Sequence, residues 1–334
     1  MKRTIRSLAV SLAFFTLASP LLAARIRAFD AVYTATLSGI PAGTKNVRIW
    51  IPVPSSRDHQ IVSNIRIDAP FAWKENVEPE FGNHYLFATL PEAPGGDVTV
   101  TISFTVQRNE ITFASLQAGK ISDRELERDL KPDRLVTLSP RVRQLADRVA
   151  GGASSTLDQA HRIYDYLVTS MTYDKSTPGW GHGDSERACD IRKGNCTDFH
   201  SLFISLARAR GIPARFVIGF PVSASPDGQM KGYHCWAEFW DGSKGWVPID
   251  ASEASQSKDP TVRAYLFGNL DPDRVAFSIG RDIRFPEGTK EPLNYFVYPY
   301  AESNGESVGR GSISLQYRES KPQQRSAATS AEGR

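Results

Sequence analysis

The segment Gly194-Asn195-Cys196-Thr197-Asp198-Phe199-His200 begins the helix around which this chain is organised. Asn195 can cap this helix, Asp198 adds negative charge to its first turn, and Gly211 followed by Pro213 ends it. Apolar residues then recur at steps of three and four, which predicts one buried helix face: Phe199, Leu202, Phe203, Leu206 and Ala207.

This helix start predicts a reactive cysteine. Cys196 lies in the first turn, near backbone N–H groups that have no helical acceptor. The positive end of the helix dipole favours the thiolate, which is the form that attacks a carbonyl carbon. Such a nucleophile also needs a base and a group that orients the base.

A predicted hairpin supplies both of these groups. Residues 234–240 and 246–250 have strand-like patterns and are joined by a Gly-containing turn. If Phe239 opposes Gly245, then His234 opposes Asp250, and both side chains lie on one face. Cys196, His234 and Asp250 are therefore candidates for the nucleophile, base and orienting acid of covalent acyl transfer.

Three separated motifs resemble the transglutaminase-like superfamily over roughly residues 135–255. They are Gly-x-Cys-x-Asp at 194–198 with a helix ending Arg-Gly-Ile-Pro-Ala-Arg at 210–215, His-x-Trp-x-Glu at 234–238, and Gly-Trp-x-x-x-Asp at 245–250. The resemblance implies an α+β fold with a papain-like core of helices packed on an antiparallel sheet. It also implies a triad of Cys196 as nucleophile, His234 as base and acid, and Asp250 as orienting group.

One residue departs from the family pattern. Cys235 follows the histidine, where the family commonly has alanine. Strand alternation predicts that Cys235 points away from His234 and into the core. Cys189 and Cys235 can either pair with each other or remain small buried thiols; an odd total of three cysteines leaves at least one unpaired within the chain.

The sequence before the helix region is predicted to form short strands. Five strand-like runs lie between residues 29 and about 106 and are separated by turns rich in Gly, Pro and Asp, which predicts a β-sandwich. The expected division is a signal peptide at 1–24, a β-sandwich domain at 25–112, a transglutaminase-like catalytic domain at 113–318 and a disordered tail at 319–334. Isolated His59 and His84 are expected to be surface or packing residues.

Helix-start signals follow the strands. Ser122 with Glu125 forms a capping-box pattern, Ser139-Pro140 fits an N-cap before a first-turn proline, and Thr156 with Gln159 predicts another start. The glycine-alternating segment 179–184 either walls the substrate groove or is a plain loop. It is not a phosphate-binding loop, because no Lys-Ser/Thr follows its last glycine.

The first residues predict export. Basic residues precede the short apolar run 8–17, and small residues follow it, as in a cleavable signal peptide. Removing residues 1–24 removes three of the 40 basic residues, which leaves 37 against 37 acidic ones. A neutral mature chain predicts no nucleic-acid partner. We expect a periplasmic or secreted protein with no stable membrane span after signal removal.

The residues favour an exported cysteine peptidase, amidase or acyltransferase that acts on peptide, protein or cell-envelope amides through a thioester. The alternative is an inactive transglutaminase-like module that binds peptides or envelope polymer. No cofactor or metal is expected, since the chain has neither C-x-x-C nor H-E-x-x-H.

Overall fold

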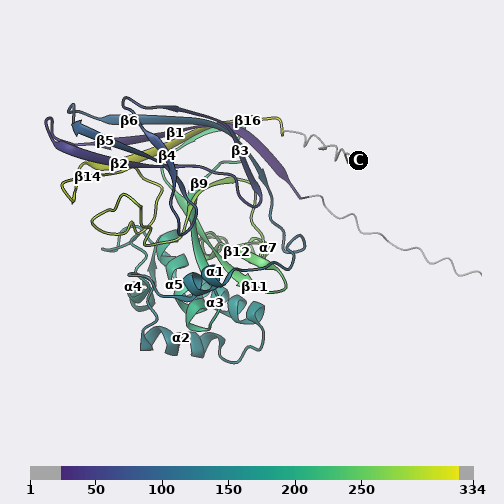
Figure 1. Cartoon of the computed structure of the whole chain (residues 1–334). Coiled ribbons are helices and arrows are strands. Elements are labelled where there is room, and N and C mark those ends of the chain that lie inside the picture. The colour runs from purple at the N-terminus through teal and green to yellow at the C-terminus, as the bar shows by residue number, and fades with distance from the viewer. Residues whose placement is uncertain (1–23, 323–334) are drawn as a thin grey trace, which may run out of the picture.

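The computed structural model describes residues 24–322 and shows a mixed α/β chain with antiparallel sheets (Figure 1). The expected signal peptide, apart from its last residue, and positions 323–334 of the expected tail lie outside the described residues. None of the described helices is long and apolar enough to cross a membrane.

The strands expected in the first part of the chain are all present. They are β1 (Ile26–Ser38), β2 (Lys45–Val53), β3 (Gln60–Asp68), β5 (His84–Glu92) and β6 (Val98–Asn109), with the additional strand β4 (Lys74–Val77). Buried and less buried positions alternate along β6 and much of β1, which is the pattern of strands with one face in a core. These strands divide between two five-stranded sheets.

Both sheets are completed by strands from later in the chain. Their orders are β10-β16-β1-β6-β3 and β15-β14-β2-β5-β4, and the late strands are β10 (Asp227–Met230), β14 (Tyr300–Ser303), β15 (Glu306–Ser307) and β16 (Arg310–Ser320). β16 runs antiparallel to β1 along its length, and Figure 1 shows the two side by side.

This pairing differs from the expected division of the chain. The sequence predicts a catalytic domain that ends at 318 and a tail that begins at 319, but Glu319 and Ser320 continue β16 and pair with Phe29 and Ala28. The strands after residue 300 extend the sheets of the first hundred residues, because β1 and β2 each offer them a free edge.

A third sheet has four strands in the order β12-β11-β9-β13, and helix α5 packs on one of its faces. Its strands are β9 (Ala214–Pro221), β11 (His234–Asp241), β12 (Gly245–Ile249) and β13 (Arg274–Ile279). The helices are α1 (Asp123–Leu130), α2 (Pro140–Ala150), α3 (Thr156–Ser170), α4 (Ser185–Ile191), α5 (Cys196–Ala209), α6 (Ala251–Gln256) and α7 (Pro260–Tyr265), and β7 (Thr172–Tyr173) pairs with β8 (Lys193–Gly194).

Helix α5 is more deeply buried than its sequence predicts. The pattern indicated one buried face, but every residue from Cys196 to Ala207 is buried. The reason is that α5 lies against β9 and β11 and is also contacted by α2, α3, α4 and α6. The ring of Phe203 packs on Phe239 of β11 at a centroid distance of 6.1 Å, which fixes the helix over this sheet.

The hairpin β11–β12 has a register different from the predicted one. Phe239 pairs with Val247, and Asp241 pairs with Gly245, so the predicted pairing of Phe239 with Gly245 is wrong by two residues. A two-residue shift leaves every side chain on its original face, because side chains alternate with a period of two. Asp250 follows the end of β12 and caps α6.

Candidate active site

The start of α5 is held by its own polar side chains. Asn195 Oδ1 accepts the backbone N–H of Thr197 at 2.9 Å, and Asp198 Oδ2 accepts the N–H of Asn195 at 2.9 Å. This is the capping-box geometry, which confirms the predicted helix start. Cys196 is therefore the first residue of the helix, and it is 2% exposed.

Asp198 also fastens the glycine-rich segment to this helix start. It accepts N–H groups from Gly181 at 2.7 Å and Gly183 at 3.1 Å. Trp180, Gly181 and His182 line a hollow of about 240 Å³ together with Tyr233 and three further residues. Tyr233 in turn is hydrogen-bonded to Asn195 and Thr197, the two residues that flank Cys196. The segment thus walls a hollow next to the helix start.

His234 and Asp250 are brought together. The imidazole Nε2 lies 2.6 Å from Asp250 Oδ2, so the other ring nitrogen, Nδ1, is left for a different partner. Burial alone would lower the pKa of His234, but the charge of Asp250 and its hydrogen bond outweigh burial and raise the pKa to about 10. The imidazolium is therefore the favoured form at neutral pH.

Asp250 is fully buried and accepts from several donors. Its Oδ1 accepts the Ser252 hydroxyl and the Glu253 N–H, both at 3.0 Å, and its Oδ2 accepts Arg274 Nη1 at 3.1 Å. Burial raises the pKa of this carboxyl, but the charges of His234 and Arg274 reverse the effect and hold it well below its usual value. Asp250 is thus fixed as a carboxylate that orients the imidazole.

The side chains of Cys235, His234 and His200 lie close enough to Cys196 to shift the pKa of its thiol. The hydrogen bond from Cys235, followed by the hydrogen bond and charge of His234, outweighs burial and lowers the pKa of Cys196 well below its usual value. The structure therefore brings all three predicted site residues together and favours a thiolate–imidazolium pair.

Cys235 is buried, as strand alternation predicts, but it lies against the site rather than in a remote part of the core. Its Sγ is 3.8 Å from Thr197 Oγ1 and 3.7 Å from His200 Nδ1 on α5. Burial and the neighbouring Cys196 raise the pKa of Cys235, so it remains a thiol that can donate. Cys189, Cys196 and Cys235 are all free.

Sequence reasoning assigned no role to His200 or Arg274. His200 is fully buried, and its Nε2 lies 3.5 Å from Asp250 Oδ1. It follows Cys196 by four residues on one helix, a spacing that places both side chains on the same face and was available as a signal. Arg274 comes from β13, and no local pattern connects it to Asp250.

A second hollow, of about 350 Å³, opens beside the imidazole. His234 and Arg274 line it, together with the carboxylates of Glu253, Asp271 and Asp273. The neighbouring residues Tyr233 and His234 therefore border one hollow each.

The same residues do not suit a metal ion. Among the described residues, His234, Asp250 and Glu253 place possible ligand atoms within 4.8 Å of one another. Arg274 donates to Asp250 at 3.1 Å and to Glu253 at 3.2 Å, so its charge opposes a cation between them. A ligand histidine must also be neutral, and His234 favours its protonated form.

Residues 143–251 match the model of the Transglutaminase-like superfamily. Over this region the chain is similar to the transglutaminase-like superfamily, so residues 143–251 form a transglutaminase-like core. All three site residues fall within the matched region, as do the capped start of α5 and the hairpin β11–β12. The transglutaminase-like core therefore contains the geometry described above.

Known proteins resemble the chain over different lengths. An uncharacterised protein of Haemophilus influenzae is 28% identical over 310 residues, which cover 80% of this chain and 84% of that protein. A protein-glutamine gamma-glutamyltransferase of Pseudomonas aeruginosa is 30% identical over 128 residues, which cover 34% of this chain but only 18% of that enzyme.

A solved structure shares the fold. It is a candidate cysteine protease of Cytophaga hutchinsonii, with a TM-score of 0.61 and 15% sequence identity. The match covers 90% of this chain and 94% of the other, so it includes the sheets outside the transglutaminase-like core.

Proposed function

We propose that this protein is a cysteine-dependent amide hydrolase or acyltransferase that acts on peptide or protein amides through a thioester. The observation that supports this function is the 2.6 Å contact between His234 and the buried Asp250, beside a helix-start cysteine whose pKa His234 helps to lower. The Pseudomonas relative, whose name describes transfer of protein glutamine groups, supports amides as the substrate class.

The proposed reaction has two stages. The Cys196 thiolate attacks the amide carbonyl carbon, and the carbonyl electron pair moves onto oxygen to give an oxyanion. The backbone N–H of Cys196, at the start of α5, is placed to donate to this oxyanion. When the oxyanion collapses, the carbon–nitrogen bond breaks, His234 gives its proton to the leaving amine, and a thioester remains.

The second stage regenerates the thiolate. Neutral His234 takes a proton from water or from an incoming amine as that molecule attacks the thioester. The carbon–sulfur bond then breaks and releases either a carboxylic acid or a new amide. Asp250 stays ionised in both stages and keeps the imidazole aligned, since its pKa is held well below neutral pH.

Export and the arrangement of the first sheets are part of the proposal. The pattern of residues 1–24 supports a cleaved signal peptide and a periplasmic or secreted enzyme. The two five-stranded sheets both contribute to one buried apolar cluster, which supports their packing as a β-sandwich.

The alkylation rate of Cys196 against pH tests the activation of the thiol. We expect rapid carboxamidomethylation by iodoacetamide that persists below pH 7, and a rate that falls in His234→Ala because the imidazolium no longer stabilises the thiolate. Mass spectrometry of the peptides assigns the labelled cysteine. A rate that follows an ordinary thiol titration in the wild type would contradict the proposal.

Substrate turnover tests the reaction itself. A library of glutamine- and asparagine-containing peptides should release ammonia or amine with the wild type, and this release should disappear in Cys196→Ala. Cys189→Ala is the matched control, because Cys189 lies on α4 and is assigned no role. A reactive Cys196 without any turnover would instead favour a peptide-binding module.

A further inference from the structure

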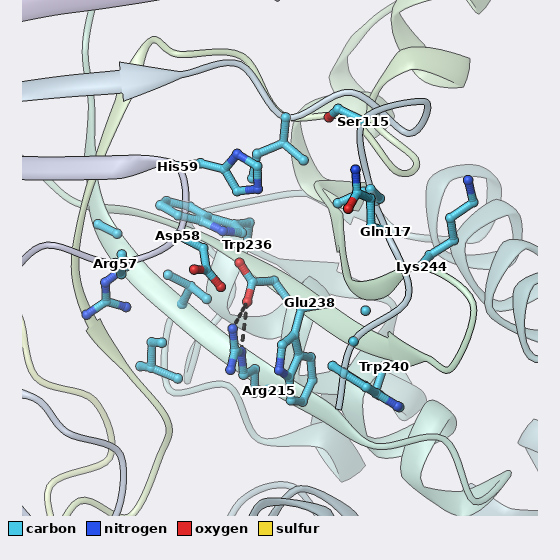
Figure 2. Close-up of a pocket in the computed structure, with 18 of the residues that line it drawn as sticks. Arg57, Asp58, His59, Ser115, Gln117, Arg215, Trp236, Glu238, Trp240 and Lys244 are labelled. Carbon is cyan, nitrogen blue, oxygen red and sulfur yellow. Dashed lines mark hydrogen bonds and ion pairs between the residues drawn. The ribbon is translucent and has the colours of Figure 1, made fainter. Parts of the chain in front are cut away.

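A third cavity, apart from the two hollows near the start of α5, lies on the other side of the sheet that carries His234. Side chains of β11 alternate between its faces: Cys235 and Phe239 contact α5, whereas Trp236, Glu238 and Trp240 line a cavity of about 480 Å³ (Figure 2). Arg57 and Arg108 line the same cavity from the first part of the chain. The cavity therefore lies between the transglutaminase-like core and the N-terminal strands, a common position for ligand sites.

The lining has an excess of positive charge. Five arginine or lysine side chains face three carboxylates, an excess of 5 − 3 = 2 charges. Arg215 and Glu238 neutralise each other, with Nη2 and Oε2 2.7 Å apart, and Figure 2 shows this pair on the cavity wall. The Glu125 carboxylate accepts a hydrogen bond from the Ser122 backbone N–H in the capping box of α1. The excess charge thus remains on other arginines and lysines.

Two arginines there form no salt bridge with any described residue. Arg108 is 2% exposed, its Nη1 reaches only the neutral Gln60 Oε1 at 3.3 Å, and its Nε has no hydrogen-bond partner. Nε and Nη1 of Arg57 are buried and likewise unpartnered within residues 24–322. A buried cation without a hydrogen-bonded counter-charge is costly, so these donors point to a negatively charged ligand.

The electrostatics agree with this geometry. Burial is the main cause that lowers the pKa of Arg57 and of Arg108, each to about 10; neighbouring arginines lower both further, and the carboxylate of Glu238 only partly offsets the shifts. Arg57 and Arg108 are also close enough to repel each other. An oxyanion placed near both would relieve this repulsion and accept their free N–H groups.

The rest of the wall suits an organic group rather than a bare ion. Trp236 is fully buried, and its indole Nε1–H has no acceptor among the described residues. Trp240 and Trp246 also line the cavity, and its volume lies within the range of small-molecule sites. Aromatic faces beside cationic donors match a molecule with an apolar part and an anionic end.

We propose that this cavity binds a small organic anion, whose carboxylate or phosphate is held by Arg57 and Arg108 and whose apolar part packs against Trp236 and Trp240. The site shares no side chain with the Cys196–His234–Asp250 cluster. Its ligand binding is therefore independent of whether Cys196 is catalytic.

Three phenyl compounds test the proposal on the full chain at low ionic strength. Phenyl phosphate and phenylacetate carry the two possible anionic ends on one apolar group, and 2-phenylethanol is the neutral control. Isothermal titration calorimetry should detect at least one anion binding tighter than 2-phenylethanol, and the preferred anion identifies the source of the oxyanion. In parallel, nuclear magnetic resonance spectra should show that the bound anion shifts the indole N–H signal of Trp236. The Trp236→Phe variant lacks this signal and therefore assigns it.

Arginine variants locate the binding. Arg57→Gln and Arg108→Gln should each weaken the preferred anion by about tenfold or more, as expected for loss of a charged hydrogen bond. Arg148→Gln, on an exposed position of α2, removes the same charge and should leave binding unchanged. Near-ultraviolet circular dichroism checks folding; if buried Arg108→Gln unfolds, the half-buried Arg57 still gives the test.

The proposal is overturned if neither anion binds, if 2-phenylethanol binds as tightly as both anions, or if the folded arginine variants bind like the wild type.

Discussion

His234 is the residue on which the charge of the candidate site depends. It is the first residue of β11, and its partner Asp250 is fully buried just after the end of β12. Because each charge shifts the pKa of the other group, their pairing must contribute to stability in a pH-dependent way. This follows from the ion pair itself and does not require catalysis.

The first prediction concerns this pH dependence. Folding raises the pKa of His234 from about 6.5 to about 10, so its stabilisation is complete below about pH 6.5 and is lost as the pH rises through 10. Folding lowers the pKa of Asp250, so its stabilisation is present above about pH 4 and is lost on acidification. Both contributions coincide between about pH 4 and 6.5.

Urea unfolding of His234→Gln measures the effect. The His234→Gln variant and its reference chain both carry Cys196→Ala, so that no thiol titrates beside the imidazole. The free-energy difference between the chain that keeps His234 and the His234→Gln variant should be largest near pH 5 and should shrink toward pH 10. A difference that stays constant over this range would contradict the assigned ion pair.

The second prediction concerns Cys235. The Cys235→Ala variant loses the hydrogen bond that contributes most to lowering the pKa of Cys196, so that pKa should rise. Alkylation of Cys196 should therefore slow at pH 6 by several-fold or more and approach the wild-type rate at pH 9. Cys189→Ala is the control for loss of a buried thiol. An unchanged pH profile would show that Cys235 does not contribute to the activation of Cys196.

For single residues, the sequence correctly predicted that His234 and Asp250 meet, although the predicted register of the hairpin β11–β12 was wrong by two residues. His234 was expected directly opposite Asp250, but the true register places Asp250 two positions away, beyond the last strand residue. The contact persists because diagonal neighbours on one face remain within reach of long side chains. The bond from Arg274 to Asp250 could not be predicted, since Arg274 lies on β13 and no local pattern connects it to the residue after β12.

Among the elements, the segment before α4 determines how the start of α5 is covered. A Cβ at Gly183 would lie 2.4 Å from Ser201 Oγ and 2.7 Å from Thr197 Cγ2, and its φ is +66°. Both the left-handed backbone and the close approach to α5 therefore require glycine at this position.

The third prediction separates these two requirements. Gly183→Ala should lower the free energy of unfolding by about 1–3 kcal/mol more than Gly39→Ala, because overpacking adds to the backbone cost. Gly39 is the matched control, since it has a φ of +76° but no atom within 4 Å of an added Cβ. Urea denaturation of both variants provides the comparison; equal losses would mean that the contact with α5 relaxes freely.

Helix boundaries were largely predictable because caps are local. Ser122 with Glu125 and Ser139-Pro140 begin α1 and α2 as predicted, whereas α3 is capped by Ser155 and not by Thr156. The short helix α4 and strand β10 were missed. α4 has seven residues, too few for a clear apolar period, and β10 is almost entirely exposed, so it has no alternation to detect.

At the level of the whole molecule, β16 joins the end of the described chain to its beginning. β1 lies between β6 and β16, so the backbone hydrogen bonds along one of its two edges come from the last described strand. The contact could not be predicted from sequence, because a hydrophobic pattern identifies a strand but not a distant partner.

The fourth prediction tests this closure. A chain that ends at residue 309 lacks β16 and leaves the β1 edge unpaired, whereas a chain that ends at 322 retains every residue of that strand. We expect the shorter chain to lose cooperative thermal unfolding and to aggregate, because a long unpaired edge can pair with other chains. Equal melting temperatures and monodispersity for the two chains would contradict this expectation.

The position of β16 also has a consequence for the order in which the chain can fold. Residues 123–279, which form the helices and the four-stranded sheet, leave the ribosome before β16, the second partner of β1, has been made. Sheets built from such distant segments form slowly, since loop closure precedes the contacts that stabilise it. The strands β1, β6 and β3 can pair early, but the outer edge of β1 stays unpaired until residues 310–320 are made, and during that time the incomplete sheet is exposed to aggregation.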